Sequence, residues 1–198
     1  MNCADLLMLK DEALTKISDE SFCSKLFGDV ICEDVSYVKG PRWTIIPLEL
    51  EMSGVTPSAI IEKEPVSKKN LSKCYFYDGQ LVKIESYNSQ GQLDEFETFK
   101  VFEGRLFSLR KNKHHEILWL KIAELDGGKV SRACRVDGDM EYWAYRYSWE
   151  GEQVKEVVSL ASNGVAGTVI KVEYDIDSTV ARVFFFSGGN EIELYNHI

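Results

Sequence analysis

The chain has 198 residues, of which 44% are hydrophobic and 12% aromatic, so it can bury a core and is not expected to be disordered. Its formal net charge is −9, from 32 acidic and 23 basic residues. This balance argues against a nucleic-acid-binding protein, which needs a basic surface to replace the counterions of the phosphates. It is compatible with a basic protein partner, although an acidic excess is also ordinary for a cytosolic protein.

The cysteines and the apolar segments indicate the compartment. The five cysteines are widely spaced, and no two form a C-x-x-C pair, which predicts free thiols and no zinc site. The first residues include acids and no long apolar run, so no secretory signal is expected, and no stretch is long enough to cross a bilayer. We therefore expect a cytoplasmic protein with no membrane association, no metal and no cofactor. The cysteines are Cys3, Cys23, Cys32, Cys74 and Cys134.

Residues 1–28 are predicted to form two short helices, because their apolar residues recur at helical spacing. Ser18 is the predicted N-cap of the second helix, and Gly28 ends it. Neither helix is stable alone in water, so both are expected to dock on the rest of the chain. The apolar positions are Leu6, Leu7, Ala13, Leu14 and Ile17 in the first helix and Phe22, Leu26 and Phe27 in the second.

Residues 30–61 have the composition of strands. A strand is predicted from Trp43 to Met52, with Pro47 favouring an edge position or a bulge. The polar segment Glu62 to Lys73 is the predicted linker. The expected organisation is therefore an N-terminal helical and strand segment at 1–73 that packs on a sheet formed by residues 74–198.

Residues 74–198 contain a repeat of about 25 residues, marked by two interleaved sets of turns. The first-type turns are marked by Gly79, Gly104, Gly128 and Gly151, at spacings of 25, 24 and 23 residues, and Asp175 opens a fifth. The second-type turns are marked by Asn88, Asn112, Asp137, Asn163 and Gly188, at spacings of 24, 25, 26 and 25 residues. Asp-Gly and Asn-Gly pairs tolerate the positive φ angles of tight hairpin turns.

The segments between these turns alternate or run apolar, which is typical of strands. The predicted fold class is therefore mainly β: an antiparallel β-meander of about ten strands, with short N-terminal helices. A twisted sheet of this size curls or splits. The sequence leaves open whether it forms a half-barrel, a closed barrel or two packed sheets.

The first-type turns share a local pattern of an aromatic or Leu, an acid, glycine, a polar residue and then Leu or Val. It reads Tyr77-Asp78-Gly79-Gln80-Leu81 and Phe102-Glu103-Gly104-Arg105-Leu106 in the first two copies. This pattern resembles the tyrosine-aspartate (YD) repeat of the bacterial RHS family; the Tyr-x-Gly pattern of MORN repeats fits less well. In that family the repeats form long β-meanders. Short proteins with similar repeats occur among the immunity partners of polymorphic toxins, so the resemblance implies a toxin-neutralising role.

Few residues are arranged for chemistry. His114-His115-Glu116 follows a second-type turn and is interpreted as a polar turn and not as a metal site. No phosphate-binding loop, nucleophile elbow or paired-cysteine motif is visible, so we expect no enzymatic activity. Trp143, Tyr145, Tyr147 and Trp149 share one face of a strand, as a core or as an exposed recognition stripe, and we favour the core.

The leading functional hypothesis is an immunity protein that binds a cognate toxin domain, for example a basic nuclease, and covers its active site. The expected partner-binding residues form two acidic patches with one aromatic residue. The alternative is a small-molecule-binding protein or small enzyme with a site in the concave face of the sheet, lined by Trp119, Trp143 or Tyr147. The partner-binding residues are Asp137, Asp139 and Glu141, then Asp94, Glu95 and Glu97, and Trp143.

Overall fold

The computed structural model describes residues 3–26, 28, 30–164 and 167–197. The chain is mainly β, with 51% of its residues in strands and 13% in helices. Within the described ranges, thirteen strands form one antiparallel sheet, in the order β13-β12-β11-β10-β9-β8-β7-β6-β5-β4-β3-β1-β2. The outermost strands, β13 and β2, do not pair with each other there, so the sheet is open. The predicted fold class is confirmed.

The elements have the following bounds. In this part of the chain the helices are α1 (Ala4–Ile17), α2 (Glu20–Leu26) and α3 (Glu49–Met52). The strands are β1 (Asp34–Val38), β2 (Ile60–Ile61), β3 (Ser72–Tyr77), β4 (Gln80–Tyr87), β5 (Leu93–Phe102), β6 (Arg105–Asn112), β7 (Ile117–Asp126), β8 (Lys129–Asp137), β9 (Tyr142–Glu150), β10 (Gln153–Ala161), β11 (Thr168–Tyr174), β12 (Val180–Ser187) and β13 (Asn190–Asn196).

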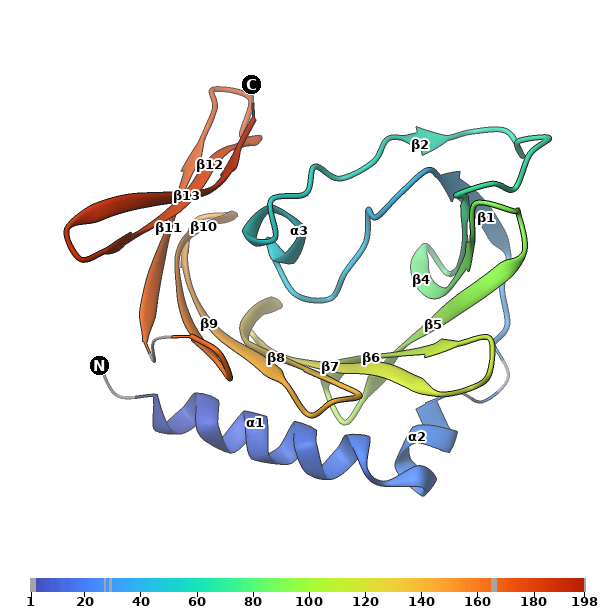
Figure 1. Ribbon diagram of the computed structural model, residues 1–198, viewed down its shortest axis with the longest axis horizontal. Coiled ribbons are helices and arrows are strands. Elements are labelled where there is room, and N and C mark those ends of the chain that lie inside the picture. Colours follow the sequence, from blue (N-terminus) through green and yellow to red (C-terminus); the bar gives the residue numbers. More distant parts are fainter. Residues whose placement is uncertain (1–2, 27, 29, 165–166, 198) are drawn as a thin grey trace.

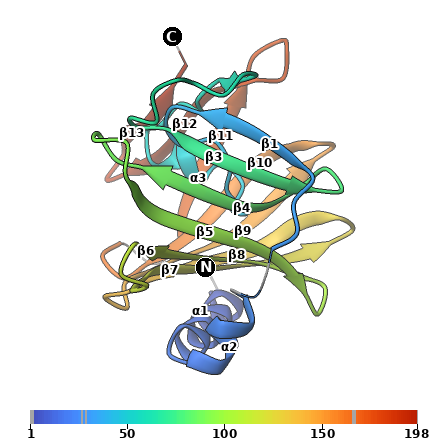
Figure 2. The same cartoon turned by 90° about the vertical axis from the view of Figure 1, so that its right-hand side faces the viewer.

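The sheet curls into a trough, which answers the question that the sequence left open (Figure 1). The helices α1 and α2 lie against its convex side, beneath β5 to β9 (Figure 2). The segment 39–59, which includes α3, enters the concave side and then crosses the mouth of the trough toward β2 (Figure 1). The sheet is therefore covered on both faces by parts of the N-terminal 73 residues.

Every predicted turn joins two neighbouring strands. The first-type turns connect β3–β4, β5–β6, β7–β8, β9–β10 and β11–β12. The second-type turns connect β4–β5, β6–β7, β8–β9, β10–β11 and β12–β13. Gly104 has φ 75° and Gly128 has φ 83°, as tight hairpin turns require. The described part of 74–198 and its flank hold eleven strands, β3 to β13, and β1 and β2 extend the sheet beyond β3. Residues 62–71 connect β2 to β3 without regular structure.

The convex core explains why the N-terminal helices form. On α1, Leu6, Leu9, Ala13 and Ile17 are buried on one face, against apolar side chains of β6 to β10. Of the predicted apolar positions, Leu7 is exposed. Two ion pairs orient α1: Asp5 with Arg146 at 3.0 Å and Glu12 with Arg105 at 2.7 Å.

The predicted cap of the second helix was wrong by one residue. Asp19 Oδ1, and not Ser18, accepts the backbone N–H of Phe22 at 3.1 Å. The Ser18 hydroxyl donates backwards to the carbonyl of Leu14 at 3.2 Å, so it is not free to cap. Phe27 lies outside the described residues. No helix in the described ranges has the length and apolar character that crossing a membrane requires.

The predicted strand from Trp43 to Met52 does not form. The chain turns at Leu48, which has φ 59°, and continues as α3. Ile46 is fully buried in the concave core, and the carbonyl of Pro47 accepts the hydroxyl of Tyr147 at 3.0 Å. This segment thus follows contacts with the sheet floor and not its local strand propensity.

The aromatic stripe on β9 is part of this concave core. Tyr145 and Tyr147 are buried, and Trp143 and Trp149 pack partly buried against the same cluster. The core interpretation is confirmed. The cover is provided by residues 45–52 and not by the N-terminal helices, which lie on the other face.

Candidate functional site

Three second-type turns share one geometry, and they span residues 88–92, 112–116 and 137–141. In the third, Oδ1 of Asp137 accepts the backbone N–H groups of Asp139 at 3.1 Å and of Glu141 at 3.0 Å. Asn88 and Asn112 accept the corresponding pairs of N–H groups in the other two turns. In each turn, one side chain thus binds two backbone N–H groups of the same turn. These hydrogen bonds hold the backbone of the three turns in one conformation.

The fourth residue of each turn has a left-handed backbone. Gly91 has φ 79°, His115 has φ 66° and Met140 has φ 64°. A side chain in this region costs roughly 1 kcal/mol relative to glycine. The ring of His115 packs edge-on against Phe96 at 5.4 Å, which offsets part of that cost. The side chain of Met140 is 49% exposed, so the turn displays an apolar group at its tip.

The structure brings together the residues of the first predicted acidic patch. The carboxylate of Asp137 is occupied within its own turn. Asp139 is exposed beside Met140, and Oε1 of Glu141 accepts a bond from Nδ2 of Asn163 in the next second-type turn at 2.8 Å. Asp139, Met140 and Glu141 therefore present two acids and one thioether on a fixed turn; we call these three residues the acidic rim.

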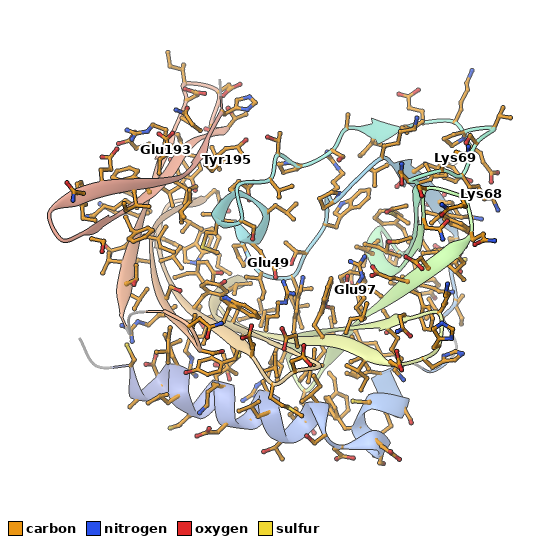
Figure 3. All side chains as sticks on the ribbon, viewed as in Figure 1. Glu49, Lys68, Lys69, Glu97, Glu193 and Tyr195 are labelled. Atoms are coloured by element: carbon orange, nitrogen blue, oxygen red, sulfur yellow. The ribbon has the colours of Figure 1, made fainter. Side chains whose placement is uncertain are left out.

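The second predicted patch is divided. Asp94 is half-exposed, with an oxygen 4.0 Å from Nζ of Lys113. Glu95 and Glu97 pair with Arg110, and Glu97 is only 3% exposed because it points into the trough (Figure 3). These three carboxylates do not form one exposed surface.

Glu97 belongs to a buried polar cluster on the concave face. Its carboxylate accepts a hydrogen bond from the hydroxyl of Ser108 at 2.6 Å and another from the indole N–H of Trp119 at 3.3 Å. Nη1 of Arg110 lies 3.7 Å from its second oxygen. A buried carboxylate requires such partners, so Glu97 holds the side chains around it in place.

Next to this cluster, cations and aromatic rings alternate across four neighbouring strands. The guanidinium of Arg110 on β6 lies 4.4 Å from the ring centre of Trp119 on β7. Arg135 on β8 lies 4.5 Å from Trp119 and 5.1 Å from Trp143 on β9. We call these four residues the cation–aromatic ladder. Each contact contributes about 0.5–1 kcal/mol where it is partly solvated, so the ladder stiffens this part of the trough.

An ion pair attaches the inserted segment to the floor of the trough. Nζ of Lys121 on β7 lies 2.6 Å from Oε2 of Glu49 on α3 and 3.2 Å from the hydroxyl oxygen of Thr44. The Thr44 hydroxyl donates to the same carboxylate oxygen, and Nη1 of Arg135 lies 3.7 Å from the other one. The side chains of Glu49 and Lys121 are 9% and 6% exposed, so the pair is held almost without water.

The convex side carries a second group of titratable residues around Glu85. Burial pushes the pKa of this carboxyl up, but hydrogen bonds from Lys83 at 2.7 Å, from Tyr75 at 2.7 Å and from Tyr87 at 3.1 Å outweigh burial and lower it. Burial, together with the neighbouring carboxylate, raises the pKa of Tyr87 to about 12. Glu85 therefore stays ionised and the two tyrosines stay protonated near neutral pH.

The remaining predicted groups are placed as follows. His114 and His115 lie in a turn, as expected. In the described ranges, no group of three or more His, Cys, Asp or Glu side chains is arranged to hold a metal ion. Burial raises the pKa of Cys74 and that of Cys134 to about 12, so both thiols stay protonated.

Sequence reasoning missed the ion pair and most of the ladder. Lys121 did carry a signal, because it is the one charged residue in the apolar run from Ile117 to Ala123. A lysine at such a position requires a buried partner. The sequence does not mark Glu49 as the partner, because it alternates with leucines in the run Leu48-Glu49-Leu50-Glu51, where a carboxylate on the exposed face of a strand is expected.

Two comparisons with known proteins were negative. The chain matches no protein-family model. No curated protein matches it at a significant level.

Proposed function

We propose that this protein is a non-catalytic binding protein whose acidic rim recognises a basic protein partner, and that this partner is a toxin domain which it neutralises. The observation that carries the proposal is the turn at 137–141. It presents Asp139, Met140 and Glu141 on a backbone that hydrogen bonds from Asp137 already fix.

Rigidity matters because ordering a loop on binding costs free energy. A turn that is fixed in the free protein avoids that cost, so more of the contact energy contributes to affinity. The two carboxylates favour encounter with a basic surface. The Met140 side chain is flexible and polarisable, and it adapts to an apolar contact at the centre of such a surface.

The toxin assignment rests on the YD-type repeat and on the charge. The first-type turns resemble the YD repeat, and short proteins with similar repeats occur among the immunity partners of polymorphic toxins. A net charge of −9 suits a basic nuclease as the partner. Asp94, Glu95 and Trp143 are all partly exposed near the second-type turns. Glu95 pairs with Arg110, which leaves Asp94 and Trp143 as the two further predicted residues open to a partner. In this proposal both lie at the margin of the interface. Glu95 and Glu97 act indirectly, by holding Arg110.

The candidate partners are the products of the genes that flank the gene of this protein, so the test is co-expression with such a neighbouring product. We expect the two proteins to co-purify in a fixed ratio, and we expect growth to be restored in cells that the neighbouring product alone arrests. The reversed-charge variant Asp139→Lys/Glu141→Lys should lose both effects. Folded wild-type protein that neither co-purifies with the neighbouring product nor relieves the growth arrest would contradict the proposal.

A further inference from the structure

A cavity of about 410 Å³ opens on the concave side, between the segment 38–43 and strands β3 to β6. Its lining residues come from the segment 38–43, from residues 70–71 and from β3 to β6, whereas the acidic rim lies between β8 and β9. The strands β1 and β4 lie at one side of the trough (Figure 1). Glu97 points into this side of the trough (Figure 3). The volume lies within the range of roughly 300–1,000 Å³ that small-molecule sites occupy.

The charge of this cavity is opposite to that of the protein. Its lining includes three cations, Lys39, Arg42 and Arg110, and one carboxylate, Glu97. Arg110 is paired with Glu97 and with Glu95. Among the described residues, no carboxylate lies within 4.0 Å of Arg42 or Lys39, so these two charges are not neutralised. A chain with a net charge of −9 thus places an excess of positive charge in one concave site.

The arginine that carries this excess is held in place. Nη1 of Arg42 donates to the carbonyl of Ser58 at 2.7 Å, and its guanidinium lies 5.4 Å from the ring centre of Trp43. An arginine has five N–H donors. Nε of Arg42 is buried and has no hydrogen-bond partner in the described part of the chain. Arg42 is therefore pre-oriented and keeps donors that an anionic group would satisfy.

The opposite wall is apolar. Leu71, Cys74 and Ile84 are buried there, and the hydroxyls of Ser72 and Ser86 lie 3.4 Å apart. Val38 adds an apolar contact from the segment 38–43. A few polar groups on a mostly apolar wall are typical of sites that bind a small organic molecule in one orientation.

We propose that this cavity binds a small organic anion, with its negative group at Arg42 and its apolar body against Val38 and Ile84. The site is independent of the acidic rim. A ligand there also contacts Trp43, and Trp43 belongs to the segment that Glu49 attaches to the sheet floor.

The test uses two fluorescent probes that differ by one charged group. 8-Anilinonaphthalene-1-sulfonate is an aromatic anion, and N-phenyl-1-naphthylamine is the same molecule without the sulfonate. We expect the anion to bind wild-type protein at one site per chain. We expect Arg42→Gln to weaken its binding at least tenfold, about the loss of one hydrogen-bonded charge contact. The neutral probe should bind no better to the wild type than to this variant.

The matched control is Arg182→Gln, because Arg182 lies on β12 and pairs with Glu173, Glu191 and Glu193 outside the cavity. This control should bind the anion as the wild type does. If Arg42→Gln fails to fold, Lys39→Gln replaces it, with an expected loss of about threefold for an exposed charge. Two results would overturn the proposal. One is that the anion binds Arg42→Gln as tightly as wild type, and the other is that wild type binds both probes with the same affinity. The Asp139→Lys/Glu141→Lys variant should keep its anion binding, so failure of this site and failure of the rim are separable.

Discussion

Glu49 and Lys121 are 72 positions apart in the sequence, yet Nζ of Lys121 lies 2.6 Å from Oε2 of Glu49 inside the curled sheet. This contact joins the short helix α3 to the central strand β7. It attaches the segment 39–59, which also carries Trp43 and Arg42, to the floor of the trough. One buried ion pair thus connects an irregular segment to the regular meander.

Glu49→Gln is expected to destabilise the protein by about 3–5 kcal/mol, because it leaves the Lys121 ammonium buried without its counter-charge. Urea denaturation of the wild type and the variant measures this difference. The double variant Glu49→Gln/Lys121→Met removes both charges and should recover a large part of the loss. The pairing would be contradicted if the destabilisations were additive, that is, if the double variant lost as much free energy of unfolding as Glu49→Gln and Lys121→Met lose separately.

Met140→Gly should stabilise the free protein by about 1 kcal/mol, because glycine adopts the left-handed backbone at φ 64° without a steric penalty. The same variant should bind the partner more weakly, because it removes the exposed side chain at the tip of the acidic rim. Thermal unfolding and titration with the partner measure the two effects.

The reverse change provides the control. Gly91→Ala, at the equivalent position of the turn at 88–92, should destabilise the protein by about 1 kcal/mol, since the backbone there has φ 79°. The nearest atom to an added Cβ is 3.7 Å away on Lys68, so crowding does not explain a loss. A Met140→Gly variant that is both less stable and equally tight in binding would contradict the role given to this residue.

Glu85→Gln should lower stability by about 1–2 kcal/mol at neutral pH, because a charged acceptor of three hydrogen bonds becomes neutral. The pKa of Glu85 in the folded protein is lowered from its ordinary value of 4.5. The stabilisation is therefore complete above pH 4.5, where the unfolded chain is ionised too, and is lost as the pH falls through the lower folded pKa.

The difference in unfolding free energy between wild type and Glu85→Gln should accordingly be constant from pH 6 to 7 and shrink below pH 4.5. Glu150→Gln is the control, since that carboxylate is solvent-exposed and pairs with the exposed Lys155. A difference that grows on acidification would show that Glu85 is not stabilised in its ionised form.

The meander was predictable because its turns are encoded locally. Asn88, Asn112 and Asp137 each close a turn with their own side chain, and the turn glycines adopt the positive φ that few other residues tolerate. A regular spacing of such residues specifies hairpins without knowledge of distant contacts. The curl of the sheet was not predictable in the same way. The N-terminal helices pack on one face and residues 45–52 on the other, and these contacts between distant parts of the chain are not encoded in any short segment.

The path of residues 43–52 was not predictable in this way. Its apolar residues and Pro47 are typical of an edge strand, but burial of Ile46 and the contact between Glu49 and Lys121 determine the structure. These partners lie on strands far along the chain. The pairing of Glu97 with Arg110 was missed for a different reason. The two residues face each other on the neighbouring strands β5 and β6, but Glu97 was assigned to an exposed acidic patch, whereas the structure buries it in the trough.

The most direct test of the binding function is the affinity of the acidic rim for the purified product of the neighbouring gene, measured by isothermal titration calorimetry. The control is Asp126→Lys/Glu152→Lys, which reverses two exposed charges at the first-type turns. We expect Asp139→Lys/Glu141→Lys to bind at least a hundredfold more weakly than wild type, and the control to bind within about threefold of it. Equal loss in both variants, or no loss in the rim variant, would contradict recognition through residues 137–141.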